Sequence, residues 1–471
     1  MQDRFRRSAL RAGVAVVVLV ALPAALPAAA TPSPGSTGVF ESQLTSDARY
    51  AEGEPSIAIN PKNPANVIVT FLANTGLGAY GAQSGQLPPT TRDHEQTIQG
   101  CDYLMSFNGG RSWARGSLPI TNFQIDPTRP NCSDTLVLFD RRGVAYVIGS
   151  SYQFPTFAAG QGDFRLISSR DGGRTWTNPS VVSPALVGSG SNPGAWQGAR
   201  FYDDREYMAL DASTGTLYVN GTQGRADARG SAGNMEYLTA SRDGGLTWSD
   251  ALAVGTANPV QLAAAYGIAA FTSPPPTNST RECVCDDFIV STDGGRTVRR
   301  RPSPVPGSAA TAGSAGNALG GAATVADPRR PGHFVVMTAD AAGRLLVFRT
   351  ANAGKSWSMG GSLSVPGRGV SKIWLAYSPH GVLGVGWRGT NSDGTYGFYG
   401  AVSADNGTTF TMHRISRTDS PRTDPLWVAG DDTSAIWLTD DRFYATWGDW
   451  RGGSLQTWWG GFPIRSGFAA K

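Results

Sequence analysis

Short apolar stretches separated by polar turns run along most of this chain. In each unit an apolar strand is followed by a polar turn and a second apolar strand, a pattern typical of β-hairpins. Seven such units occur, at residues 55–71, 135–150, 207–221, 260–272, 322–338, 373–387 and 435–447. We find no segment with a helical period after residue 30, so the pattern predicts an all-β chain.

A second pattern, the octapeptide Ser/Thr-x-Asp-x-Gly-x-Thr-Trp, recurs six times between these units. Residues 169–176 and 241–248 fit it fully; residues 106–113, 291–298, 350–357 and 403–410 are variants, with Asn108 and Asn352 in place of Asp. An Asp or Asn followed by glycine predicts a turn, because the side chain accepts local N–H bonds and glycine allows positive φ. Recurrence every 50 to 72 residues favours a radial or solenoid array.

The octapeptide resembles the Asp-box, or BNR repeat, of the sialidase-like β-propellers. Segments 54–61 and 204–211 are similar to those of secreted bacterial BNR-repeat proteins, often described as sialidase-like or glycosyl hydrolases. The resemblance covers nearly all of the chain after the leader and implies a propeller. In that superfamily the boxes lie at the periphery in enzymes and non-enzymes alike, so we interpret Asp171 and Asp243 as structural residues.

Seven hairpin units against six octapeptides predict a β-propeller of seven four-stranded blades, with six blades as the alternative. Residues 454–464 are expected to form a third strand after the last hairpin. Residues 38–44 then supply the last strand of that blade and close the ring, which leaves no open sheet edge. The expected organisation is an N-terminal segment at 31–47 followed by one propeller domain at 48–465.

The first thirty residues are predicted to be an export signal, with a basic start, an apolar stretch and the small residues Ala28 to Ala30. This leader carries four Arg and one Asp, so the formal charge of +4 falls to +1 without it. We therefore expect a secreted, extracellular protein with no nucleic-acid partner and no membrane partner after signal removal. The resemblance to the BNR-repeat proteins implies a glycan or glycoconjugate as partner, and we expect a monomer.

Four cysteines fit an oxidising compartment. We favour a Cys101–Cys132 disulfide, with Cys283 and Cys285 either linked or free. A metal site at residues 283–287 lacks a second ligand cluster, and we expect no cofactor and no metal.

Propeller topology predicts which side chains share one face. The starts of first strands and the ends of second strands lie at the mouth of the central channel, opposite the octapeptide turns. This face collects Glu54, Asp134, Asp204, Arg205, Glu206, Tyr207, Lys372, Arg388, Asp449 and Arg451. The insertion at residues 72–100 also lies there and is a candidate lid.

The chemistry of this set suggests a glycosidase. Arg205, Arg388 and Arg451 are candidates for binding a substrate carboxylate, because guanidinium groups bind carboxylates bidentately. Glu54, Asp134 and Asp449 complete the expected substrate-binding set. Asp204 and Glu206 are acid/base candidates and Tyr207 a candidate nucleophile, as sialidases use a Tyr nucleophile. Trp387, Trp447 and Trp450 are candidates for stacking on sugar rings.

Two functions stay open. Sialidases carry an Arg-Ile-Pro motif before the first blade and have six blades; here residues 51–54 stand in that place without an arginine. We favour an exo-acting glycoside hydrolase of sialidase-like type on a carboxylate-bearing sugar. The alternative is a non-catalytic propeller that binds a glycan or protein, in which case the arginines pair with neighbouring blades and the tryptophans pack between blades.

Overall fold

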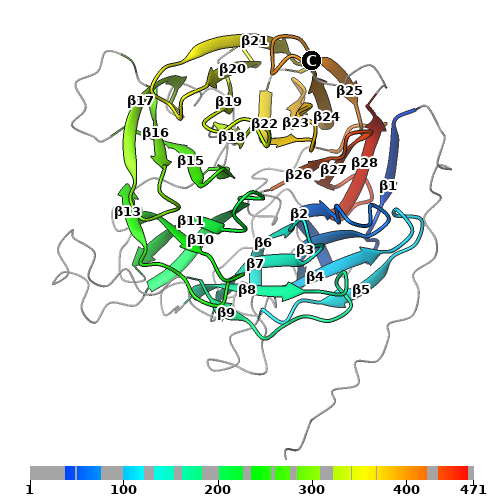
Figure 1. The fold of residues 1–471 in the computed structure, drawn as a ribbon. Coiled ribbons are helices and arrows are strands. Elements are labelled where there is room, and N and C mark those ends of the chain that lie inside the picture. Colours follow the sequence, from blue (N-terminus) through cyan, green and yellow to red (C-terminus); the bar gives the residue numbers. More distant parts are fainter. Residues whose placement is uncertain are drawn as a thin grey trace, which may run out of the picture.

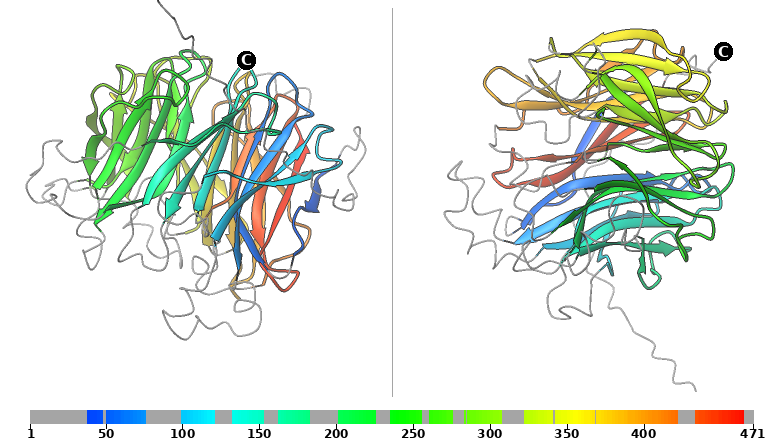
Figure 2. Two further views of the ribbon diagram at one scale, coloured as in Figure 1. Left: turned by 90° about the horizontal axis from the view of Figure 1, so that it is seen from below. Right: turned by 90° about the vertical axis from the view of Figure 1, so that its left-hand side faces the viewer.

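The computed structural model describes residues 38–47, 50–75, 99–120, 132–152, 162–182, 201–225, 235–255, 260–275, 283, 285–307, 322–340, 342–367, 369–421 and 433–464. Over these residues the chain forms seven antiparallel sheets of four strands each and no helix. The sheets are arranged as blades around one axis, as Figure 1 shows. The side views show them side by side in a single ring (Figure 2). The predicted seven-bladed propeller is therefore confirmed.

Six blades each take four consecutive strands, ordered from the axis outward. Blade 1 has β2 (Tyr50–Ile59), β3 (Val67–Thr75), β4 (Gln99–Ser106) and β5 (Ala114–Ser117). Blade 2 has β6 (Cys132–Phe139), β7 (Ala145–Tyr152), β8 (Gly162–Ser169) and β9 (Ser180–Val181). Blade 3 has β10 (Phe201–Leu210), β11 (Leu217–Arg225), β12 (Met235–Ser241) and β13 (Leu252–Gly255).

The next three blades follow the same plan. Blade 4 has β14 (Ala263–Ala265), β15 (Ile268–Ser273), β16 (Cys285–Ser291) and β17 (Arg299–Pro306). Blade 5 has β18 (Ala323–Ala326), β19 (Phe334–Ala339), β20 (Arg344–Thr350) and β21 (Ser358–Ser364). Blade 6 has β22 (Gly369–Tyr377), β23 (Leu383–Thr390), β24 (Tyr396–Ser403) and β25 (Thr411–Arg414).

Blade 7 joins the two ends of the described chain. Its strands are β26 (Ala435–Leu438), β27 (Arg442–Asp449), β28 (Gln456–Pro463) and, as the outermost, β1 (Phe40–Gln43). β1 pairs antiparallel with β28, with Phe40 opposite Gly461. Because β28 and β1 are far apart in sequence, no turn connects them. An octapeptide has no place in this blade, which is why seven blades carry six octapeptides.

Each octapeptide forms the turn between the third and fourth strands of its blade. In the third copy, Ser241 Oγ donates to Asp243 Oδ1 (2.8 Å), and the amides of Gly245 and Thr247 donate to Ser241 Oγ and Asp243 Oδ1. Thr247 Oγ1 also donates to Asp243 Oδ2 (2.5 Å). This last bond, with the other donors, outweighs burial and lowers the pKa of Asp243 to about 2. The carboxylate is fully occupied by its own turn.

The glycine at the fifth position of each octapeptide touches the preceding blade. All six of these glycines have positive φ, and a Cβ added to any of them would come within 3.1 Å of a side-chain carbon of that blade. We call this the glycine contact, and its pairs are Gly110–Trp459, Gly173–Ile68, Gly245–Leu166, Gly295–Ala240, Gly354–Phe288 and Gly407–Val347. The six contacts join every neighbouring pair of blades except blades 6 and 7.

Blades 6 and 7 are held by other means. The rings of Phe398 and Trp447 stack with centroids 5.1 Å apart, and Trp450 N donates to Ser420 Oγ (2.8 Å). Trp387, Trp447 and Trp450 are all buried. The expectation that they stack on sugars is therefore wrong, since their indoles pack within and between blades.

The glycine contact can be separated from the cost of positive φ. Gly109 and Gly110 are neighbours in one turn with φ of 71° and 82°, but only Gly110 meets Trp459, whereas a Cβ at Gly109 meets nothing within 4 Å. Gly109→Ala should cost about 1 kcal/mol of unfolding free energy, the strain of the left-handed conformation. Gly110→Ala should cost roughly 1–3 kcal/mol more, because the methyl group displaces the indole. Chemical denaturation of both variants checks this; equal losses would contradict the glycine contact.

Candidate functional site at the channel mouth

Four innermost strands carry a β-bulge near one end. The pairing register shifts between Gly53 and Ser56 in β2, with equivalent shifts in β6, β10 and β22. In each of these strands the first residue of the shifted stretch is charged. We call these four residues the bulge positions: Glu54 in blade 1, Asp134 in blade 2, Arg205 in blade 3 and Lys372 in blade 6. Two acids and two bases thus share one level of the propeller.

Three of these residues have a backbone conformation that is unfavourable for a side chain. The φ angles are 51° at Glu54, 51° at Asp134 and 56° at Lys372. Each such angle costs on the order of 1 kcal/mol, and residues of this kind cluster at functional sites. Glu54 and Lys372 are also buried, with 5% and 8% of their surfaces exposed. Three strained charged residues at one level point to a site that the fold maintains at some cost.

The bulges correct the expected strand boundaries. The apolar pattern predicts first strands beginning at residues 55, 135, 207 and 373. The strands begin earlier, at Tyr50, Cys132, Phe201 and Gly369. The extra residue of each bulge breaks the two-residue alternation on which the pattern depends. Glu54 and Asp134 therefore lie inside strands rather than at the strand starts where they were expected.

Aromatic side chains close the channel beside the bulges. The rings of Tyr207 (blade 3) and Trp374 (blade 6) lie across the channel from each other with centroids 5.8 Å apart. The Gln261 side chain spans from blade 4 to blade 6, donating to Leu375 O (2.7 Å) and accepting from Leu375 N (2.9 Å). A cavity of about 220 Å³ along the inner strands includes Ser56, Tyr207 and Trp374 in its wall. The channel is thus narrow and bridged by side chains at this level.

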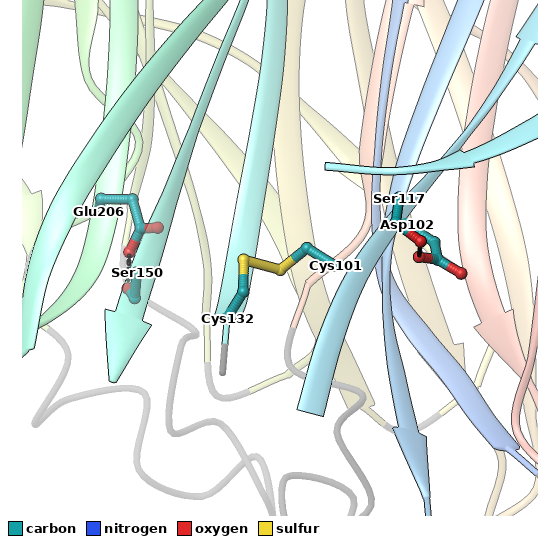
Figure 3. Close-up of a disulfide and its surroundings, with 6 residues drawn as sticks. All are labelled: Cys101, Asp102, Ser117, Cys132, Ser150 and Glu206. Atoms are coloured by element: carbon teal, nitrogen blue, oxygen red, sulfur yellow. Dashed lines mark hydrogen bonds between the residues drawn. A yellow bond between two sulfur atoms is a disulfide. The ribbon is translucent and has the colours of Figure 1, made fainter. Parts of the chain in front are cut away.

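Glu206 and Tyr207 have different surroundings although they are adjacent in sequence. Glu206 is buried and accepts a hydrogen bond from Ser150 Oγ of blade 2 (2.8 Å), as Figure 3 shows. Tyr207 lies in the channel against Trp374. Near the Ser150–Glu206 bond, the predicted Cys101–Cys132 disulfide links β4 to β6 with 5.5 Å between Cα atoms (Figure 3). Cys283 and Cys285 are also linked. Blades 1, 2 and 3 are thus tied together near the mouth.

Arg451 and Asp449 form one ion-pair network with the ring-closing strand. Arg451 donates to both carboxylate oxygens of Glu41 in β1 (3.1 Å each) and to Asp449 Oδ2 (2.7 Å). Asp449 is 1% exposed and also accepts from Trp447 Nε1 (3.1 Å). These hydrogen bonds and the two negative charges outweigh burial and raise the pKa of Arg451. Arg451 therefore joins blade 7 to its own last strand.

Arg388 is completely buried at the boundary between blades 6 and 7. Its guanidinium lies 4.0 Å from the centroid of the Tyr396 ring and donates to Gly448 O (3.4 Å). Arg388 and Arg451 thus meet the same segment of blade 7, Arg388 in the interior and Arg451 half-buried in its ion pairs. Their role in substrate binding remains a prediction, and their contacts show a structural one.

Several predicted features fall outside the residues whose side chains are described. The backbone places Asp204 opposite Thr222 in the β10–β11 pairing, but the side chains of Asp204 and Arg205 are not described. The export signal and most of the candidate lid, residues 76–98, also lie outside the described residues. Where the structure is described, it contains no helix able to cross a membrane and no group of three or more His, Cys, Asp or Glu suited to a metal ion.

The structure adds a buried carboxyl group that the sequence analysis missed. Glu236 at the start of β12 is fully buried and accepts from Ser273 Oγ of blade 4 (2.7 Å). Burial raises its pKa to about 8, against the lowering effects of Ser273 and the Arg300 charge. Third strands begin at the mouth just as second strands end there. Inspection of third-strand starts would have found Glu236 and the neighbouring Asp286 and Asp287.

Known proteins share the fold at very low sequence identity. No family model matches the chain, and no curated protein matches its sequence. A protein of unknown function from Dyadobacter fermentans matches with a TM-score of 0.51 and 14% identity over 90% of this chain and 98% of that one. Hadza microbial sialidase Hz136 matches with a TM-score of 0.45 and 12% identity, over 79% of this chain and 75% of that one. Trypanosoma rangeli sialidase with the inhibitor DANA matches with a TM-score of 0.45 and 12% identity, over 92% of this chain and 57% of that one. These likenesses concern the fold alone.

The Arg451–Glu41 pair should contribute to stability. Arg451→Gln and Glu41→Gln should each lower the unfolding free energy by about 1–3 kcal/mol, because each removes the charge-assisted hydrogen bonds between a half-buried guanidinium and a largely buried carboxylate. The double variant should lose less than the sum of the two. A double-mutant cycle by chemical denaturation measures the coupling. Additive losses would show that the pair does not hold β1 in place.

Glu236 should make the protein less stable as pH rises. The pKa of Glu236 is about 8 in the folded state and about 4.5 in the unfolded state. Between these two pH values the folded state keeps a proton that the unfolded state has lost, so the free energy of unfolding falls as pH rises through this window. Glu236→Gln should remove this fall and stabilise the protein at pH 8, by on the order of 3 kcal/mol. Thermal unfolding from pH 5 to 9 checks this; an unchanged slope would contradict it.

Proposed function

We propose that this chain is a secreted, carbohydrate-active β-propeller that cleaves a terminal, carboxylate-bearing sugar at the mouth of its channel. In this proposal it is an exo-acting glycoside hydrolase of the sialidase-like type and works as a monomer outside the cell. The observation that carries the proposal is the set of bulge positions, where Glu54, Asp134 and Lys372 are held with positive φ at one level. A propeller that needed only stability would place glycine there.

The carboxyl groups of Glu54 and Asp134 supply the chemistry. They come from adjacent blades, at equivalent positions in β2 and β6. Glycoside hydrolysis uses one carboxylic acid to protonate the leaving oxygen and one carboxylate as base or nucleophile. Glu206 and Tyr207 lie on the next inner strand; Tyr207 borders the channel and remains the candidate for a tyrosine nucleophile.

Two cations at the bulge level suit the carboxylate of the sugar. Lys372 and Arg205 occupy the same register position as the two acids, in blades 6 and 3. A cation beside the substrate carboxylate provides charge-assisted hydrogen bonds. In this arrangement they take over the binding task first expected of Arg388 and Arg451, which are engaged between blade 6, blade 7 and β1.

The alternative is a propeller that binds a glycan without cleaving it. The engagement of Arg388 and Arg451 with neighbouring strands favours this alternative, because a sialidase needs free arginines at the mouth. The seven blades also differ from the six of sialidases proper. Both functions use the same face, so an assay must separate binding from cleavage.

Hydrolysis and binding should be measured on the same preparations. The probes are sialyl-lactose, a glucuronide and a neutral galactoside, each tested with the wild type, Glu54→Gln and Asp134→Asn. Loss of the acid or base should lower kcat/KM by about 10²–10⁴-fold while thermal stability and glycan binding persist. Asp250→Asn, which removes an exposed carboxylate far from the bulges, is the matched control and should behave as the wild type.

The outcomes separate the two functions. Cleavage of the acidic sugars alone, lost in both variants, supports the hydrolase. Binding without cleavage, weakened by Lys372→Met, supports the glycan-binding propeller. Neither binding nor cleavage of any probe by the wild type would contradict a carbohydrate site at the mouth.

A further inference from the structure

A run of three arginines in β17 divides between the two faces of its strand. Arg299 and Arg301 lie opposite Val290 and Phe288, whose side chains belong to the core between blades 4 and 5. Arg300 lies opposite Ile289, which packs with blade 3. Because cross-strand partners share a face, Arg299 and Arg301 lie on the side of blade 5. β17 is at the outer rim of the ring (Figure 1).

A cavity of about 380 Å³ lies at this rim between blades 4 and 5, on the face of the octapeptide turns. Residues from both blades line it. Arg299, Arg301 and Thr292 come from blade 4, and Gly332, Asn352 and Lys355 come from blade 5. The cavity is therefore at the opposite face from the bulges and is independent of the function proposed for the mouth.

No acidic side chain among the described residues pairs with the three cations of this cavity, Arg299, Arg301 and Lys355. Arg301 donates to the carbonyl oxygens of Ala353 and Asn352. Among described residues, Arg299 and Lys355 have neither an ion pair nor a side-chain hydrogen bond. Burial and the charge of Arg299 lower the pKa of Arg301.

Several other arginines of the propeller do have a carboxylate partner. Arg300, between the two, pairs with Asp287 (3.0 Å) and donates to Val254 O. Carboxylate partners are likewise present for Arg115, Arg142, Arg330, Arg344, Arg414 and Arg451. Three cations that converge on one cavity without a carboxylate leave a positive potential which a bound anion would neutralise.

We propose that this cavity binds a sulfate or phosphate group, either as the free ion or as an ester on an acidic polysaccharide. A multiply charged oxyanion has enough acceptor oxygens for two guanidinium groups and one ammonium group. The Thr292 hydroxyl adds a neutral donor at the wall. Arg301 has a second task, since it holds the octapeptide turn of blade 5. Arg299 and Lys355 are the side chains whose removal tests the site alone.

The test compares Arg299→Gln/Lys355→Gln with a control of equal charge change, Arg174→Gln/Lys62→Gln. Arg174 and Lys62 are exposed on the same face, in blades 2 and 1. Calorimetry at low salt measures binding of inorganic sulfate and phosphate, and affinity electrophoresis measures retardation by sulfated dextran. Thermal unfolding verifies that both variants are folded.

The wild type should bind at least one probe, and the test variant should bind it at least about tenfold more weakly while the control does not change. If inorganic sulfate or phosphate binds as strongly as sulfated dextran, the cavity is a site for the free ion. If sulfated dextran retards the protein and neither ion binds detectably, the cavity is a site for a polysaccharide ester. Absence of binding to all three probes, or equal weakening in the control, would overturn the proposal.

Discussion

The packing of a glycine against the preceding blade is the constraint on which this propeller depends. At that point the backbone needs positive φ and the neighbouring side chain leaves no space for a Cβ, so a single residue type satisfies both demands. The Asp or Asn two positions earlier fixes the turn that presents the glycine, as Asp243 does for Gly245. The octapeptide is thus a joint between blades, and its recurrence sets the radial repeat of the chain.

The boundary between blades 6 and 7 has no glycine contact, because of the topology of blade 7. Blade 7 takes its last strand from the start of the propeller, so it has no third-to-fourth-strand turn. Stacked aromatic rings, the buried Arg388 and the Arg451–Glu41 pair hold that region instead. This explains a concentration of Arg and Trp in blades 6 and 7 that, by residue type alone, resembles a carbohydrate site. Residues at the bulges, where charged side chains stand on a backbone with positive φ, are better candidates.

The sequence was sufficient for the fold because its two signals are local. Two-residue alternation and the octapeptide turn both depend on near neighbours, and together they predict the seven blades. The site depends on contacts between distant strands. Nothing near Arg388 in the sequence indicates that Tyr396 and blade 7 bury it. The bulges were also hidden, because each one interrupts the alternation at Glu54 or Asp134, so that the strand is predicted to begin too late.

The account makes Arg388 one of the contacts that hold blades 6 and 7 together, at the boundary that lacks a glycine contact. Amide hydrogen exchange of the full chain, compared between the wild type and Arg388→Met, tests this claim most directly. The account predicts faster exchange in β24 and β27, with no change in β8 and β12 beside the glycine contacts. Unchanged exchange in β24 and β27, or an equal rise in every blade, would contradict it.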